Sequence, residues 1–313
     1  MFDVFSATLS PMLVMFLCMV VGFVLNKKKL CPENTTTVLS KLETYVLCPA
    51  LTLSTFSRYC TPASLSAHSD LILFAALLTV LAIGLSYALS PLFAKKGYSR
   101  NVYKYALAFA NSGFMGNAIV PAILGEEALY AYMLFTLPLN IGIYTWGITI
   151  LIPKGEKSNP LKNLLNPPVI AVALGMVLGL SGLSAHLPAF FTNTLSSLGS
   201  CMGPVAMVLT GFVVGNYSFK AMVSDKKIYI AALLRLFILP ALFIGFLKLL
   251  GASGTVMTMT LFAFATPLGL NTVVFPAAYG GDTATGASMA TISHTVCVVT
   301  IPIMYALLTL LML

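Results

Sequence analysis

Charge is scarce in this 313-residue chain, in which Asp, Glu, Lys and Arg together make up 8% and only nine residues are acidic. Hydrophobic residues make up 58% of the chain instead. Apolar runs of about 20 residues recur along it, which is the length a helix needs to cross the hydrocarbon core of a bilayer. The composition therefore predicts an all-α, polytopic membrane protein, and no loop is long enough to form a separate soluble domain.

The chain also lacks histidines and cysteines arranged as metal ligands or as catalytic pairs. The three histidines, His68, His186 and His294, are scattered, and none pairs with an acidic residue at the spacing that a catalytic or metal site requires. The six cysteines show no paired metal-ligand spacing, and four fall within or near apolar segments, where cysteine is ordinary filling. We therefore expect no enzyme activity, no metal site and no cofactor.

Ten apolar segments are predicted to span the membrane. The first keeps its lysines after the apolar stretch and has no small-residue cleavage pattern, so it is interpreted as a retained helix. The predicted spans cover residues 4–25, 38–57, 70–93, 103–123, 128–152, 167–185, 191–214, 228–250, 255–279 and 284–312.

Positive charge follows the loops. Fourteen of the seventeen cations fall on or beside the odd-numbered loops, so the positive-inside rule places these loops in the cytoplasm and both termini on the extracytoplasmic side. A nucleic-acid partner would need basic residues clustered on a soluble domain, which is missing. The expected location is the cell (cytoplasmic) membrane, with the lipid bilayer as a partner.

The chain divides near its midpoint into two similar halves. Five spans lie in residues 1–152 and five in 167–313, on either side of a basic linker at 153–166 that is predicted to be cytoplasmic. An odd number of spans in each half makes the halves inverted relative to one another. The segment AFANSGFMGNAIVPAILG at 108–125 is answered 155 positions later by AFATPLGLNTVVFPAAYG at 263–280. These segments belong to the fourth and ninth spans, which five-plus-five symmetry makes equivalent.

Both matched segments place helix-breaking residues inside an apolar span. Gly costs roughly 1 kcal/mol relative to Ala in a helix interior, Asn favours local bonds to the backbone, and Pro removes a donor. Interrupted backbone at bilayer depth is tolerated only inside protein or along a water-filled cavity. We therefore predict two broken helices whose inner half-helices begin with free amides that stabilise an anion, although small residues in spans often serve only close helix packing. The candidate site residues are Asn111, Ser112, Gly113, Gly116, Asn117, Pro267, Gly269, Asn271 and Thr272.

Several segments, together with the two breaks, resemble the auxin efflux carrier family of membrane transport proteins. They include LCPALTLSTF at 47–56, FANSGFMGN at 109–117, GPVAMVLTGFVVG at 203–215 and TPLGLNTVVFPAAYGGD at 266–282. The plant carriers have a proline at each crossing, where Ala118 and Thr272 stand here, and a long central loop that is missing here. These differences indicate a compact, prokaryotic-type member.

The resemblance implies ten helices in two inverted repeats, with helices 4 and 9 broken and crossing, as in sodium/proton antiporters and bile acid symporters. Helices 1, 2, 6 and 7 would form a scaffold, and helices 3–5 and 8–10 a transport domain that moves like an elevator. It further implies transport of small organic anions and a homodimer.

Charged and titratable residues within spans are candidates for coupling or gating, because each costs roughly 2.5 to 3.5 kcal/mol at mid-helix. Arg235 could neutralise a substrate carboxylate or snorkel to the interface. His294 could carry a proton or simply bond neighbouring hydroxyls. Glu43 could be an interfacial residue or a ligand for a proton or cation. Pro49 and Pro204 kink their spans, either for packing or as gates.

These observations predict a secondary transporter for a small mono- or dicarboxylate, held where helices 4 and 9 cross. The alternative is a channel or a ligand-sensing membrane protein on the same fold. Coupling to H⁺ or Na⁺ is left open at this point.

Overall fold

The computed structural model describes residues 2–152, 159, 163–222, 224–278 and 283–312. Most of the predicted linker 153–166 and Gly280 of the second matched segment lie outside the described residues. The described residues form helices and turns without a β-strand, which confirms the predicted all-helical fold. Two residues far apart in the chain, Ala110 and Leu268, form an isolated antiparallel bridge.

The first half contains helices in most of the predicted spans. They are α1 (Phe2–Lys27), α2 (Thr35–Leu42), η1 (Glu43–Leu47), α3 (Cys48–Tyr59), α4 (Pro62–Ala67), α5 (Ser69–Leu89), η2 (Ser90–Leu92), α6 (Tyr98–Ala108), η3 (Ser112–Gly116), α7 (Asn117–Leu124), α8 (Glu126–Gly142), η4 (Ile143–Gly147) and α9 (Ile148–Leu151). The second half continues in the same way. Its elements are α11 (Pro167–Leu180), η5 (Leu183–His186), α12 (Ala189–Gly215), α13 (Phe219–Met222), α14 (Lys226–Leu233), η6 (Leu234–Ile238), α15 (Leu239–Leu249), α16 (Gly254–Phe264), α17 (Asn271–Ala278) and α18 (Ala284–Met312).

Six helical stretches of the described chain are long and apolar enough to cross a membrane. They are Phe2–Lys27, Ser69–Leu92, Glu126–Leu151, Ala189–Gly215, Lys226–Leu249 and Ala284–Met312. Shorter apolar helices cover Ser112–Leu124, Pro167–Leu180 and Gly254–Phe264. The predicted span at residues 38–57 lies in the continuous helical stretch 35–59, and the other three correspond to short or interrupted helices.

The helix in the sixth predicted span is shorter than we predicted from the sequence. We expected it to cover residues 167–185, but α11 has 14 residues and ends at Leu180. Gly182 adopts a left-handed conformation with φ of 73°, and the Ser181 hydroxyl donates to the carbonyl of Val177 at 2.6 Å. At 1.5 Å per residue, α11 is about 21 Å long, which is less than the roughly 30 Å of hydrocarbon in a bilayer.

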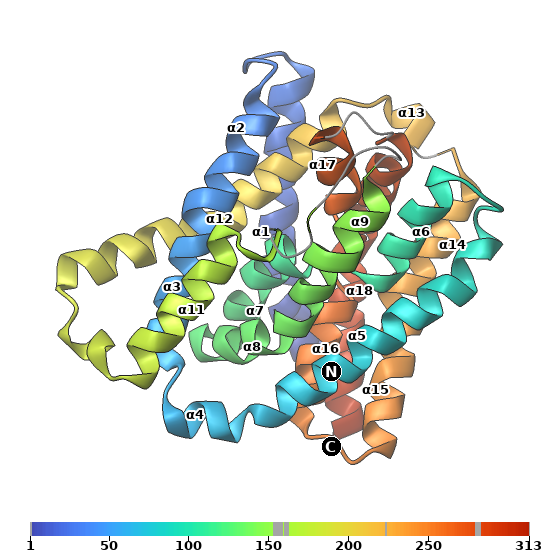
Figure 1. Ribbon diagram of the computed structural model, residues 1–313. Coiled ribbons are helices and arrows are strands. Elements are labelled where there is room, and N and C mark those ends of the chain that lie inside the picture. Colours follow the sequence, from blue (N-terminus) through green and yellow to red (C-terminus); the bar gives the residue numbers. More distant parts are fainter. Residues whose placement is uncertain (1, 153–158, 160–162, 223, 279–282, 313) are drawn as a thin grey trace.

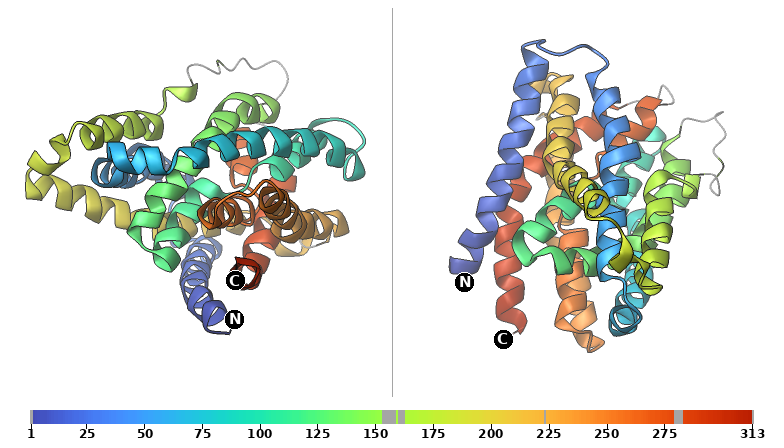
Figure 2. Two further views of the ribbon diagram at one scale, coloured as in Figure 1. Left: turned by 90° about the horizontal axis from the view of Figure 1, so that it is seen from below. Right: turned by 90° about the vertical axis from the view of Figure 1, so that its left-hand side faces the viewer.

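The helices form two packing groups (Figure 1). Helices α3 and α12 pack against each other, α11 against α3, and α1 against α12. On the other side, α5 packs against α6 and α8, and α16 packs against α8, α15 and α18. Contacts between α1 and α18 join the two groups. Both termini lie at the same end of the molecule, away from the turn between α1 and α2 (Figure 2).

Close contact between α1 and α12 depends on glycine. A Cβ atom on Gly211 would overlap the carbonyl oxygen of Met19 and lie 2.6 Å from the amide nitrogen of Phe23. A Cβ atom on Gly22 would likewise overlap the carbonyl oxygen of Val208. Since these obstacles are backbone atoms, they cannot turn away as a side chain would.

We therefore expect Gly211→Ala to destabilise the fold by about 1–3 kcal/mol, the usual cost of overpacking. The unfolding midpoint of the purified protein in detergent measures this change. Gly84→Ala is the matched control, because Gly84 is helical and a Cβ there meets nothing within 4 Å. An equal midpoint for the two variants would show that α1 and α12 are free to separate.

Four spans contain a short π-helical segment, a feature that occurs frequently at functional sites. These segments are η1, η3, η4 and η6. They carry Glu43, the residues after the first break, Tyr144 and Arg235, respectively. The irregular backbone thus falls on the titratable and glycine-rich positions that the sequence singles out, and also on Tyr144.

Candidate functional site

The two interrupted helices contact each other directly at their breaks. In the first, residues 109–111 are non-helical between α6 and η3; in the second, residues 265–270 are non-helical between α16 and α17. Ala110 pairs with Leu268, and the amide of Asn111 donates to the carbonyl of Pro267 at 2.8 Å. The freed backbone groups of one break are therefore partly satisfied by the other.

Helix α18 fixes both breaks through buried side chains. Asn111 Nδ2 lies 3.0 Å from His294 Nε2, and the amide of Leu268 donates to the Ser293 hydroxyl at 3.0 Å. His294 Nδ1 lies 2.8 Å from the carbonyl oxygen of Ala290. With the Asn111 amide in this orientation, the imidazole is the neutral tautomer with its proton on Nδ1. The partners of His294 are thus an amide and a carbonyl, where we expected hydroxyls.

A tyrosine hydroxyl forms a hydrogen bond at each of the two breaks. The Tyr132 hydroxyl donates to the carbonyl of Ser112 at 3.0 Å and lies where a Cβ atom on Gly116 would stand. In the second break, Asn271 Nδ2 donates to the Tyr105 hydroxyl at 2.8 Å. Glycine at position 116 is therefore required because the phenol occupies the space of a side chain.

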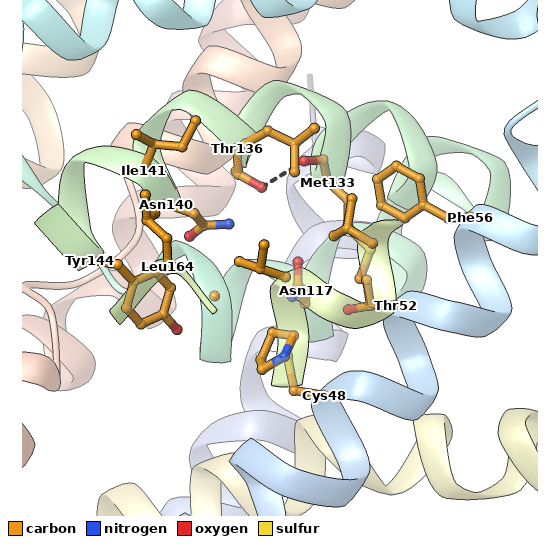
Figure 3. Close-up of a pocket in the computed structure, with 15 residues that line it drawn as sticks. Cys48, Thr52, Phe56, Asn117, Met133, Thr136, Asn140, Ile141, Tyr144 and Leu164 are labelled. Atoms are coloured by element: carbon orange, nitrogen blue, oxygen red, sulfur yellow. Dashed lines mark hydrogen bonds between the residues drawn. The ribbon is translucent and has the colours of Figure 1, made fainter. Parts of the chain in front are cut away.

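A cavity of about 230 Å³ lies against the first break, between the two packing groups (Figure 3). It is bounded by α3 and α11 on one side and by η3, α7, α8 and η4 on the other. Its lining residues are Cys48, Thr52, Phe56, Gly113, Asn117, Met133, Thr136, Leu137, Asn140, Ile141, Tyr144, Leu164, Pro168, Val169 and Val172.

The polar groups that line this pocket are neutral hydrogen-bonding groups, and none of the described charged side chains is among the lining residues. In Figure 3, Asn140 and Tyr144 lie on one side of Asn117 and Thr52 lies on the other. The side chains of Asn117, Asn140 and Tyr144 make no hydrogen bond to another described residue. Gly113 lies in the first turn of the half-helix that starts at Ser112, where backbone amides lack helical acceptors. Such a set can donate hydrogen bonds to a carboxylate without a formal charge.

The nine predicted crossover residues divide into two sets. Gly113 and Asn117 line the pocket. Asn111 and Pro267 bond the breaks to each other, and Asn271 turns its carboxamide to Tyr105. The remaining four, Ser112, Gly116, Gly269 and Thr272, provide local bonds and close packing at the breaks.

Sequence reasoning missed the contribution of the fifth span to the pocket. Thr136, Asn140 and Tyr144 stand four residues apart, so they share one face of a helix. A polar stripe of this kind in an otherwise apolar span was the available signal. Cys48 and Thr52 repeat the same spacing on α3.

The remaining candidates for coupling or gating lie in different surroundings. Arg235 and Glu43 are both fully buried in the protein. Both carboxyl oxygens of Glu43 lack a hydrogen-bond partner in the described structure. Pro49 follows the π-helical turn η1 at the start of α3, whereas Pro204 lies within the uninterrupted helix α12.

Comparison with known proteins identifies the class to which this arrangement belongs. The family model described as "Membrane transport protein" matches residues 7–161 and 156–305, which together cover most of the chain. The chain belongs to this family. The match confirms the resemblance to the auxin efflux carrier family and, with the apolar helices, a multi-pass membrane protein.

A relative with the same type of description supports this membrane transport assignment. It is an uncharacterized transporter of Methanothermobacter thermautotrophicus, 23% identical over 270 residues, which cover 84% of this chain and 86% of the relative. The similarity therefore extends over nearly the whole length of both proteins. As a membrane transport protein, the chain has a substrate to carry, and the pocket beside Asn117 is the candidate place to hold it.

Proposed function

We propose that this protein is a secondary transporter that carries a small organic anion across the cytoplasmic membrane by elevator-type alternating access. The pocket beside the first break supports this proposal best. It places neutral donors and the start of a half-helix at the boundary between two groups of helices. A site in that position is exposed to one side or the other when one group slides along its neighbour.

The proposed architecture is ten spans in two inverted repeats, residues 1–152 and 167–313, joined by the linker 153–166. The packing of α1, α3, α11 and α12 supports a scaffold made of spans 1, 2, 6 and 7. The packing of α5, α6, α8, α16 and α18 supports a transport domain made of spans 3–5 and 8–10. Direct contact between the breaks supports a crossover at spans 4 and 9.

The proposed orientation follows from charge. With the lysine-rich loops in the cytoplasm, both termini lie on the extracytoplasmic side, which is consistent with their common position at one end of the molecule. A homodimer is proposed from the resemblance to the auxin efflux carriers.

An anion is the proposed substrate class because every polar side chain that faces the pocket can donate a hydrogen bond. Asn117, Asn140, Tyr144 and Thr52 offer amide and hydroxyl protons. Within the described part of the chain, the lining has no acidic residue that would repel an anion. The apolar remainder, including Phe56 and Val172, suits the carbon skeleton of a mono- or dicarboxylate.

Counterflow in proteoliposomes tests this function. Vesicles loaded with an unlabelled carboxylate should accumulate the labelled compound with saturable kinetics and trans-stimulation. A non-saturating current would indicate a channel, and binding without flux would indicate a sensor. Either outcome would contradict the proposed transporter.

Glu43 is the proposed site of proton coupling, since its buried carboxyl has no partner among the described residues that would hold it ionised. We expect Glu43→Gln to fold with an unchanged or higher unfolding midpoint, because an amide of the same shape replaces an unpaired group. Net uptake by this variant should no longer respond to an imposed pH gradient. Glu33→Gln, at an exposed position before α2, is the control. A response equal to that of the native protein would exclude Glu43 as the coupling group.

A further inference from the structure

Arg235 is a fully buried cation in η6, at the heart of the second packing group. Its Nη1 donates to the carbonyl of Leu107 at 3.3 Å, and its guanidinium carbon lies 5.2 Å from the centroid of the Phe264 ring. Nε and Nη2 lack hydrogen-bond partners within the described chain. No ion pair joins Arg235 to a described carboxylate, so its charge must be balanced in another way.

The two groups that contact Arg235 lie at the ends of two helices. Leu107 is the penultimate residue of α6, and Phe264 is the last residue of α16. Both helices stop at a break, so their final carbonyls have no helical partner. The bridge between Ala110 and Leu268 holds the two ends close to each other.

Helix dipoles supply the missing negative charge. The C-terminus of a helix is equivalent to roughly half a negative elementary charge, so two converging ends amount to about one. This matches the single positive charge of Arg235. A guanidinium that bonds a last-turn carbonyl of α6 and packs on the final side chain of α16 is stabilised without an acidic residue.

Arg235 is not placed to be the counter-ion of a substrate in the pocket. The pocket is lined by η3, α7, α8, η4, α3 and α11, whereas Arg235 contacts the ends of α6 and α16. The substrate pocket and Arg235 are thus built from different segments of the crossing helices.

In transporters with broken helices, half-helix C-terminal ends and unwound carbonyls commonly coordinate the coupling Na⁺ or H⁺. We propose that Arg235 is a built-in cation that occupies this position permanently and holds the two breaks together. The inference rests on the proposed role of the crossing in transport. Its consequence is that the crossing needs no Na⁺, so that anion binding is independent of sodium.

The experiment measures unfolding midpoints of purified protein in detergent, at constant ionic strength, in choline, sodium or potassium chloride, and in choline chloride with a few millimolar guanidinium. The native protein should have the same midpoint in all four. Arg235→Ala should unfold several degrees lower in choline, and millimolar guanidinium or Na⁺ should restore part of the loss, because the Leu107 carbonyl oxygen is left without its cationic partner. Arg58→Ala, which removes an exposed cation, should respond to no cation.

Two further variants keep the proposal testable if Arg235→Ala does not fold. Arg235→Lys retains the charge and should stay insensitive to sodium, whereas Arg235→Gln removes the charge and should become sensitive. Equal midpoints for the native protein and Arg235→Gln, a loss that no cation repairs, or sodium stabilisation of the native protein would each overturn the proposal. Because none of these readouts requires a substrate, its failure is distinguishable from failure of anion counterflow.

Discussion

Asn117→Ala should reduce specific anion transport by about 10- to 100-fold while leaving the fold intact. Asn117 lines the pocket one turn beyond the start of the half-helix, and its carboxamide makes no hydrogen bond to another described residue. Removing a hydrogen bond to a charged ligand costs about 1.5–3 kcal/mol, which is about a 10- to 100-fold loss of affinity. Counterflow at a fixed, subsaturating carboxylate concentration should fall by that factor.

The control is Asn193→Ala, at an exposed position on α12 away from the pocket lining. It makes the same chemical change and should leave both counterflow and the unfolding midpoint unchanged. Full transport by Asn117→Ala would show that the substrate binds elsewhere, even if the two broken helices cross as proposed.

Gly116→Ala should both destabilise the protein and stop transport. A Cβ atom there would overlap the Tyr132 hydroxyl and lie 2.5 Å from its Cζ atom. Tyr132 lies at the centre of α8 with its side chain fully buried, so it has little room to move. We expect a loss of about 1–3 kcal/mol from overpacking and a further loss of about 1 kcal/mol from the bond between Tyr132 and Ser112.

Two comparisons separate these contributions. Tyr132→Phe removes the hydrogen bond alone and should cost only the smaller part. Gly245→Ala adds the same methyl group to α15, where nothing lies within 4 Å of the new atom, and should be neutral or mildly stabilising. Unfolding midpoints and counterflow are measured together. A Gly116→Ala protein as stable as the native one would mean that Tyr132 can leave its place without cost.

The sequence located both helix breaks because their cause is local. Asn111, Gly113 and Pro267 disfavour a continuous helix wherever they occur in a span, and the non-helical residues lie beside them. The hydrogen bonds that hold the two breaks in place could not be predicted in the same way. Asn111 and His294 are 183 positions apart, and no helical periodicity brings such residues together.

The end of α11 and the burial of Arg235 could not be predicted from the sequence, because both depend on tertiary structure. The end of α11 at Leu180 follows from the left-handed Gly182, whereas an apolar pattern alone continues past it. Burial of Arg235 required knowing that α6 and α16 both end beside it. From the sequence alone, an arginine at this position in the eighth span is also compatible with snorkelling to the interface.

Only some of the residues that line the pocket could be predicted from the sequence. Gly113 and Asn117 were found because they belong to a break, but Asn140 and Tyr144 lie in the fifth span, which has no break, and carry a weaker signal. Their four-residue spacing gains meaning only once α8 is known to face α3 and the first break.

A thermal-shift screen of mono- and dicarboxylates, with sodium and pH varied independently, tests the central claim most directly. Saturating ligand stabilises the form that binds it, by about 2.7 kcal/mol at a hundred times Kd. We predict that a carboxylate raises the unfolding midpoint of the native protein equally with and without sodium, and that Asn117→Ala loses this shift. Stabilisation by cations or neutral solutes, with no effect of any anion, would contradict the account.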